Sequence, residues 1–322
     1  MVRRAGAVLP VELDPLDRLI LTVLDRDPTI SYAGLSNELN VSPRTVADRL
    51  LRLRSHDIVR VVGRTLPDFD GRSAWLARAH VAPSAIGELA AELARNDRSR
   101  WVRIARDRTE MIAGFVTHSA DDSILTQLES DRRVRSAHTY ELLKVWSGQE
   151  GTVTHPSRQL DAIDRHVMRL LAEDGRMPNR ELATRLALDP STTSRRRRRL
   201  VEEGILFFEA DIHPAALDAS GDAMLWIRVS PGGIRDLGQW LRQQPECRFA
   251  AASSGAVSVI AHVMLPDAAS LVDFVDEGLA GRNIVSVDIV RMGEVLKRNA
   301  GAVQRTPVSH FRDAVGDRHS FR

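Results

Sequence analysis

Apolar residues between positions 14 and 54 recur every three to four residues, which is the spacing of the buried stripe on short amphipathic helices. The stripe predicts a helix over 14–24 and a short second helix that begins after Ser31. A third helix is predicted to start at Ser42-Pro43, with serine as N-cap and proline in the first turn. Three short helices with a tight turn before the last one are typical of a helix-turn-helix domain.

The same pattern returns 147 residues later, without a gap across about 45 residues. Leu13-Asp14-Pro15-Leu16-Asp17-Arg18 aligns with Leu160-Asp161-Ala162-Ile163-Asp164-Arg165. Further along, the offset becomes 148, which indicates one inserted residue in a loop. The chain therefore contains two copies of a unit of about 150 residues, which we call copy one (residues 13–148) and copy two (160–300).

After each helical segment the apolar pattern predicts strand, helix, strand, strand, helix and strand, the order of a ferredoxin-like domain. The predicted elements are 75–81, 86–93, 101–106, 111–117, 124–128 and 134–142 in copy one, and 223–229, 234–241, 248–252, 257–263, 271–279 and 284–290 in copy two. We therefore predict an α+β fold with two winged-type helix-turn-helix domains, each followed by a ferredoxin-like βαββαβ domain.

These elements predict seven segments. They are an N-terminal arm (1–12), a first helix-turn-helix domain (13–61), a first ferredoxin-like domain (62–148), a linker (149–159), a second helix-turn-helix domain (160–206), a second ferredoxin-like domain (207–300) and a disordered tail (301–322).

Composition excludes several classes of protein. With 43% hydrophobic and 27% charged residues, the chain is typical of a globular protein, and no apolar run approaches the length of a membrane span. The single cysteine, Cys247, excludes an internal disulfide and suits a reducing compartment, so we expect a cytoplasmic protein. Ten histidines show no metal-ligand spacing, and common catalytic motifs are absent from the sequence. We expect no catalytic residues, no metal and no cofactor.

The net charge is only +2, yet arginines gather on the third helix of each copy, with five in a row over 195–199. Arginine pairs bidentately with guanine, and Ser or Thr hydroxyls reach bases and phosphates. One such helix could be merely a solvated face, whereas two in register favour DNA binding. The predicted DNA contacts are Ser42, Arg44, Thr45, Asp48, Arg49 and Arg52 in copy one, and Ser191, Thr192, Arg195, Arg196, Arg198 and Arg199 in copy two.

Two residues of copy two break the apolar stripe. By register, Thr193 and Arg197 occupy the positions of Val46 and Leu50 in copy one. Because an unpaired buried guanidinium is costly, Arg197 must extend to solvent, pair with Glu202 or Asp174, or lie on a rotated helix. We expect this helix to favour phosphate binding over base reading.

The arrangement resembles the Lrp/AsnC family of leucine-responsive and asparagine-operon regulators. The resemblance rests on residues 13–24, 42–53, 160–165 and 200–205. It implies a regulator that binds double-stranded operator DNA through paired sensor domains, tuned by an amino acid or another small metabolite. Family effector contacts gather at a turn between the two middle strands, which here corresponds to Ser253, Ser254 and Gly255, and to Asp107 in copy one. Copy one lacks the glycine, and copy two lacks the acid that usually follows the turn in the family. An equal alternative is that both turns are purely structural.

Duplication implies that the two unlike sensor domains pair within one chain, tethered by residues 149–159, and that the chain assembles further as a homo-oligomer. Two alternatives stay open. Sirohaem decarboxylases resemble fused pairs of the same architecture, with His138, Arg103 and Arg106 as loose candidates for tetrapyrrole contacts, although a His-rich strand is not evident. The other alternative is a scaffold that does not bind DNA.

Overall fold

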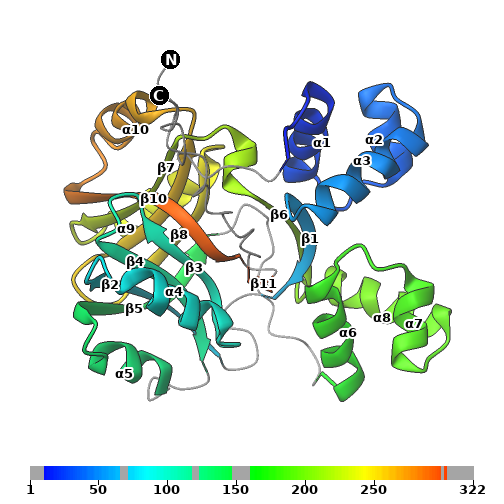
Figure 1. Ribbon diagram of the computed structural model, residues 1–322, viewed down its shortest axis with the longest axis horizontal. Helices are drawn as coiled ribbons and strands as arrows, with labels where there is room; N and C mark the ends of the chain where they lie inside the picture. The colour runs from blue at the N-terminus through cyan, green and yellow to red at the C-terminus, as the bar shows by residue number, and fades with distance from the viewer. Residues whose placement is uncertain (1–10, 66–71, 118–122, 147–159, 299–300, 303–322) are drawn as a thin grey trace, which may run out of the picture.

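The computed structural model describes residues 11–65, 72–117, 123–146, 160–298 and 301–302. Two helical units lie on one side of the molecule, and the ferredoxin-like sheets lie on the other (Figure 1). We call the helical unit of each copy its head. Head one contains α1 (Pro15–Arg26), α2 (Tyr32–Leu39) and α3 (Pro43–Ser55), and head two contains α6 (Ala162–Glu173), α7 (Asn179–Leu186) and α8 (Pro190–Glu202).

Local sequence explains where these helices begin. The Asp14 side chain accepts a hydrogen bond from the Asp17 backbone amide, and the Asp17 side chain accepts one from the Asp14 amide, which forms a capping box on α1. Ser42 and Asp189 cap α3 and α8, and each of these helices has proline in its first turn. The predicted helix-turn-helix pattern is confirmed in both copies.

The two heads share one hydrophobic core and a two-stranded antiparallel ribbon made of β1 (Val59–Arg64) and β6 (Phe207–Ile212). The boundaries predicted at 61/62 and 206/207 need correction, because the first lies inside β1 and the second assigns β6 to the ferredoxin-like domain. Neither segment was among the strands predicted from the sequence, and the sequence does not indicate that the two pair. The ribbon of β1 and β6 therefore connects head one with head two.

Each copy contains the predicted βαββαβ order. Copy one has β2 (Ser73–Val81), α4 (Ile86–Arg95), β3 (Ser99–Ala105), β4 (Glu110–Thr117), α5 (Ser123–Ser130) and β5 (Val134–Trp146). Copy two has β7 (Gly221–Val229), α9 (Ile234–Gln243), β8 (Cys247–Ser253), β9 (Val259–Leu265), α10 (Ala268–Asp273) and β10 (Ile284–Arg298), with 3-10 turn η2 (Pro214–Leu217) before β7 and π-turn η3 (Phe274–Gly278) after α10.

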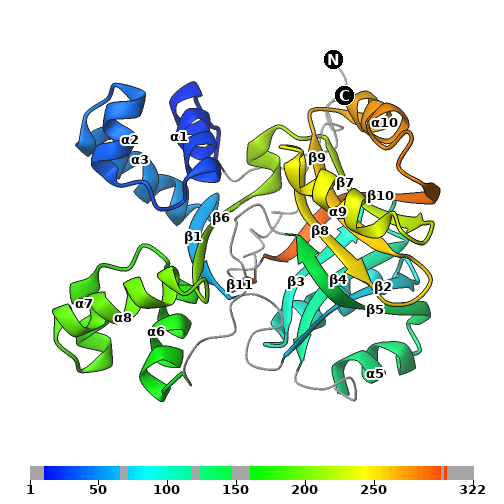
Figure 2. The same cartoon turned by 180° about the vertical axis from the view of Figure 1, so that it is seen from behind.

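The two sheets join at both edges. Strand β5 of copy one pairs with β8 of copy two, and β10 of copy two pairs with β3 of copy one. Because β10 also pairs with β7, the strands close into a ring of two unlike halves within one chain. Figure 2 shows this ring from behind, with α9 and α10 on its outer side.

Four apolar clusters lie among the residues that the structure describes. One belongs to the heads, and one lies between sheet and helices in each ferredoxin-like domain. The fourth lies between the two sheets and includes Leu76 and Tyr140 from copy one with Met224 and Trp226 from copy two. The inner faces of the two sheets therefore form an interface between the copies.

The ends of the chain qualify the predicted segments. Residues 301–302 form a short strand, β11 (Gly301–Ala302), paired with β10, so the segment predicted as a disordered tail begins as a strand. Residues 303–322, the linker 149–159 and most of the N-terminal arm lie outside the described residues. No helix in the described ranges is long and apolar enough to cross a membrane.

Candidate nucleic-acid interface

The first turn of α3 carries polar side chains held in place by short local contacts. Ser42 Oγ accepts a hydrogen bond from the Thr45 amide at 3.1 Å, and the two hydroxyl oxygens are 2.8 Å apart. The Arg44 side chain is 92% exposed and that of Asp48 is 72% exposed, with 3.9 Å between Arg44 Nε and Asp48 Oδ2. These residues form an open polar surface at the start of the helix.

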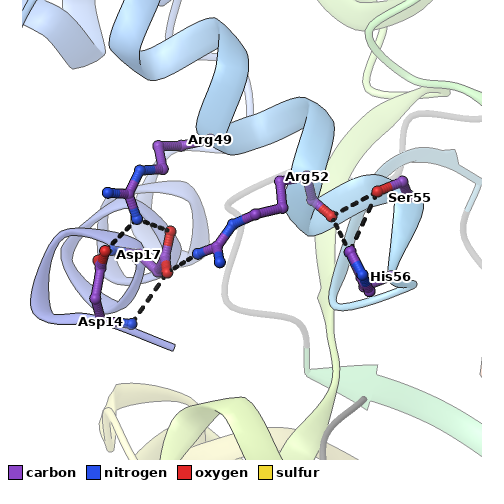
Figure 3. Close-up of polar contacts among 6 residues, drawn as sticks. All are labelled: Asp14, Asp17, Arg49, Arg52, Ser55 and His56. Carbon is purple, nitrogen blue, oxygen red and sulfur yellow. Dashed lines mark hydrogen bonds and ion pairs between the residues drawn. The ribbon is translucent and has the colours of Figure 1, made fainter. Parts of the chain in front are cut away.

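Arg49 and Arg52 of α3 point to a different surface (Figure 3). Both guanidinium groups contact Asp17, which is fully buried, and Arg49 also contacts Asp14. Hydrogen bonding to Asp14 raises the pKa of Arg49 despite partial burial. The structure thus places two of the predicted DNA contacts on the N-terminus of α1, where they fasten α3 within head one.

Head two repeats this arrangement. Arg196 Nη1 lies 2.7 Å from Asp161 Oδ2 and 2.8 Å from Asp164 Oδ1, and Asp164 is fully buried. Each of these three residues aligns with a member of the cluster in head one, so their recurrence at one offset was a sequence signal for a structural ion cluster. Arg199 bonds instead to Glu203, the C-cap of the same helix, with 2.7 Å between Nε and Oε1.

The remaining predicted contacts of copy two stay on the surface. Ser191, Arg195 and Arg198 are exposed, and Thr192 is half-buried. Ser191 and Thr192 hydroxyls donate to the Asp189 carboxylate at 2.7 and 3.0 Å, which orders the first turn of α8. Arg198 Nε is 3.6 Å from Glu202 Oε1, and both side chains are largely solvated.

Backbone groups satisfy the two polar residues that interrupt the buried stripe of α8. Thr193 Oγ1 donates to the Asp189 carbonyl at 3.1 Å. Arg197 donates to the carbonyls of Gly175 and Met177, each at 3.0 Å, and lies over the Phe208 ring with 5.0 Å to its centroid. Burial lowers the pKa of Arg197. Its hydrogen bonds reach carbonyl oxygens and not the carboxylates of the two acids considered from the sequence.

Contacts between the heads fix them relative to each other. Arg176 of head two donates to the carbonyls of Pro28 and Ile30 and lies 5.4 Å from the centroid of the Tyr32 ring. Arg54 of α3 bonds to Asp174 at 2.7 Å. Sequence reasoning missed these residues because no periodicity indicates which surfaces of two separate domains meet.

The turns predicted to bind an effector are hydrogen-bonded across the copy interface. In copy two, the Ser254 amide donates to the Glu141 carbonyl at 2.9 Å, and Ser254 Oγ accepts from the Glu141 amide at 3.0 Å. Ser253 Oγ donates to the Val257 carbonyl, and Gly255 has φ +87°, which suits glycine. These contacts account for the turn structurally.

The turn of copy one is held in an equivalent way. Asp107 accepts hydrogen bonds from the Thr109 amide at 3.1 Å and its hydroxyl at 2.9 Å. The Arg106 amide donates to the Arg291 carbonyl of copy two at 2.8 Å.

Neither turn lines the cavity of about 400 Å³ that lies in copy two, which is lined by residues between 275 and 287.

The three residues considered for tetrapyrrole binding are not gathered at one place. Arg103 is buried on β3 and bonded to Asp222, Arg106 lies in the turn after β3, and His138 is exposed on β5. Strands β4 and β2 separate β3 from β5 in the sheet. Within the described ranges, no group of His, Cys, Asp and Glu side chains could hold a metal ion.

Comparison with known families agrees with this geometry. Residues 13–54 match the AsnC-type helix-turn-helix domain, residues 160–206 match a winged helix-turn-helix DNA-binding domain, and residues 222–299 match the Lrp/AsnC ligand-binding domain. The transcriptional regulator AldR of Mycobacterium tuberculosis is 36% identical over 125 residues, which cover 38% of this chain and 70% of AldR. The chain belongs to the Lrp/AsnC family of transcriptional regulators.

Other relatives extend the comparison. AldR of Mycolicibacterium smegmatis is 35% identical over 127 residues, covering 38% of this Lrp/AsnC-type chain and 74% of that protein. The crystal structure of the siroheme decarboxylase NirDL superposes with a TM-score of 0.60 at 13% identity, covering 88% of this chain and 93% of NirDL. At that identity the likeness concerns the fold alone.

Proposed function

We propose that this Lrp/AsnC-type chain is a DNA-binding regulator, not an enzyme, and that it binds operator DNA through α3 and α8 of its two heads. The observation that carries the proposal is the shared start of these helices, where an N-cap, a proline and solvated polar side chains precede the buried stripe. In helix-turn-helix proteins the N-terminal residues of this helix contact base edges in the major groove.

The internal ion pairs divide eleven of the twelve predicted contacts into two groups, and Arg199, which bonds to Glu203, is assigned to neither. We assign DNA contact to the residues with accessible side chains near the helix starts: Ser42, Arg44, Thr45 and Asp48 in head one, and Ser191, Thr192, Arg195 and Arg198 in head two. We assign Arg49, Arg52 and Arg196 a positioning role, because their guanidinium groups already bind buried carboxylates. Head one then reads bases through Arg44, and head two supplies mainly phosphate contacts.

The two heads belong to one chain, so we propose that it binds an imperfect palindrome as an intrachain pseudo-dimer. Half-sites should be separated by about one helical turn, ~34 Å. Any metabolite binding belongs to copy two, whose residues 222–299 match the ligand-binding domain, near Ser253, Ser254 and Gly255. Further assembly into homo-oligomers is part of the same proposal.

Selection of bound sequences from a random duplex pool tests the proposal and shows half-site symmetry. Binding of the selected duplex should then weaken by about 10³–10⁵ between 50 and 200 mM salt, if six to ten phosphates are contacted. An unselected duplex of equal length is the control for non-specific affinity. Absence of salt-dependent binding to any duplex would contradict the proposal and favour the scaffold alternative.

A further inference from the structure

The interface between the two sheets joins two related but unlike surfaces. The strand register shows which positions of the two copies are equivalent. Arg78 pairs with His138 in copy one, and Trp226 pairs with Asp288 in copy two, so Arg78 is equivalent to Trp226 and His138 to Asp288. If two like copies paired, each side chain would meet the residue equivalent to its present neighbour. The differences between equivalent residues therefore decide whether two identical copies could pair through this interface.

A buried charge contact is present on one side only. Arg103 of copy one makes two bonds to the Asp222 carboxylate of copy two, one of them 3.2 Å long, and His262 Nε2 lies 2.8 Å from Asp222 Oδ1. Arg103 is 7% exposed and Asp222 is 6% exposed. The equivalent positions hold small residues that carry no charge: Ala251 for Arg103, Ala74 for Asp222 and Gly114 for His262.

Pairing of like copies would leave Arg103 without an acidic partner and would leave Asp222 with only His262 of its own copy. Copy one against itself would place Arg103 beside Ala74, and copy two against itself would place Asp222 beside Ala251. A buried ion that loses its partner is strongly destabilising, because neither water nor an opposite charge compensates it.

A second contact depends on side-chain size. Trp146, at the end of β5, packs in the core of copy two against Gly238 of α9, where an added Cβ would overlap the indole ring. The equivalent strand end in copy two carries Leu296, which lies in the core cluster of copy one with Ala90 of α4. Like pairing would force Trp146 against Ala90, or leave a void between Leu296 and Gly238.

A third contact joins two equivalent positions directly. The Arg78 guanidinium lies over the Trp226 ring with 4.6 Å to its centroid, and Arg78 Nη1 bonds to Asp288 of copy two at 2.6 Å. Copy one against itself would bring two Arg78 guanidinium groups together and replace Asp288 with His138. The cation–π attraction and the bond to Asp288 would be lost, and each Arg78 would keep only Glu110 of its own copy as an acidic partner.

We propose that the sheet interface is a pairing surface that accepts only unlike copies, so that the partner fitted by copy one is copy two and never a second copy one. Charge, size and stacking all favour the unlike pair. This inference does not depend on DNA binding.

Two full-length charge variants test the proposal. Arg103→Asp and Asp222→Arg each place like charges together within the chain, and each should lower the thermal midpoint by about 5–15 °C. Unfolded and refolded as a mixture, the two variants can exchange halves between chains and restore both contacts. We expect the mixture to regain most of the lost midpoint and to form a two-chain complex, detected with two affinity tags.

Each variant refolded alone is the control for like pairing. Arg103→Asp leaves copy two unchanged, and Asp222→Arg leaves copy one unchanged. Refolding of either alone should give no more tag exchange than the wild-type protein. The proposal is overturned if either variant alone exchanges chains as much as the mixture, or if the mixture regains no stability.

The single-chain double variant Arg103→Asp/Asp222→Arg controls for folding, since it restores an opposite-charge pair. If this double variant does not fold, the contact between Trp146 and Gly238 tests the proposal instead. Gly238→Ala should lower the midpoint, and Trp146→Leu in the same chain should recover it. An unchanged midpoint for Gly238→Ala, or no recovery in the double variant, contradicts the proposal.

Discussion

At the scale of single residues, arginines of similar sequence context have different roles. Arg44 is solvated, whereas Arg49, five residues further along the same helix, binds Asp14 and buried Asp17. Periodicity predicted correctly that both avoid the buried stripe of α3. It could not show that the start of α1 covers one of them, because that depends on how the helices pack.

Replacement of these two arginines separates DNA reading from stability. Arg44→Ala should change the free energy of unfolding by less than about 0.5 kcal/mol and cost about 1–3 kcal/mol of preference at one base pair. Arg49→Ala should lower the free energy of unfolding by about 1–3 kcal/mol, because Asp17 loses a charged partner. Urea unfolding and competition between duplexes measure the two effects. Equal loss of stability in both variants would contradict the assignment.

The His213 side chain gives the molecule a predicted pH dependence. Burial, together with the positive charge of Arg298, lowers the pKa of His213 to about 4 from 6.5. Below pH 6.5 the unfolded chain takes up a proton that the folded chain resists, so stability should be complete above this pH and fall towards pH 4. The loss attributable to His213 is at most about 3 kcal/mol.

Urea unfolding between pH 4 and 7 checks this contribution in the wild-type protein and in His213→Asn. Asparagine retains an acceptor for the Ala215 amide, which bonds to His213 Nδ1 at 3.2 Å, but cannot be protonated in this range. The variant should have a shallower slope of unfolding free energy against pH. Superimposable slopes would exclude a lowered pKa at this site.

At the scale of elements, the end of the second helix differs between the copies. Asn40 and Ala187 occupy the same C-terminal position of α2 and α7, with φ of 52° and 53°. Asparagine tolerates this left-handed conformation, whereas alanine is strained there. The repeat predicted equivalent helix ends, but not that copy two would keep the conformation after losing the favourable residue.

Substitutions at these two positions should therefore change the free energy of unfolding in opposite directions. Ala187→Gly should raise the free energy of unfolding by about 1 kcal/mol, and Asn40→Ala should lower it by about the same amount. Glycine at position 40 is the matched control and should be close to neutral. Denaturant midpoints at constant slope provide the measurement, and a loss of stability in Ala187→Gly would show that strain is absent.

At the scale of the whole molecule, the internal repeat predicted both ferredoxin-like domains and their order of elements. The ribbon of β1 with β6 was not predicted, since backbone hydrogen bonds between distant strands leave no periodic signal. The contacts of Arg103 with Asp222 were equally hidden, because each residue occurs in one copy only. The contacts that join the two halves therefore involve residues that differ between the copies, and a comparison of the repeats for shared residues does not find them.

The closed ring of strands β2–β5 and β7–β10 has a consequence for gene dosage. A regulator that must first pair two chains loses active complexes with the square of its concentration when it becomes scarce. Here both halves are synthesised together, so the number of paired units is proportional to the number of chains. A regulator built in this way can act at low copy number, and each half can change its amino-acid sequence without changing the other.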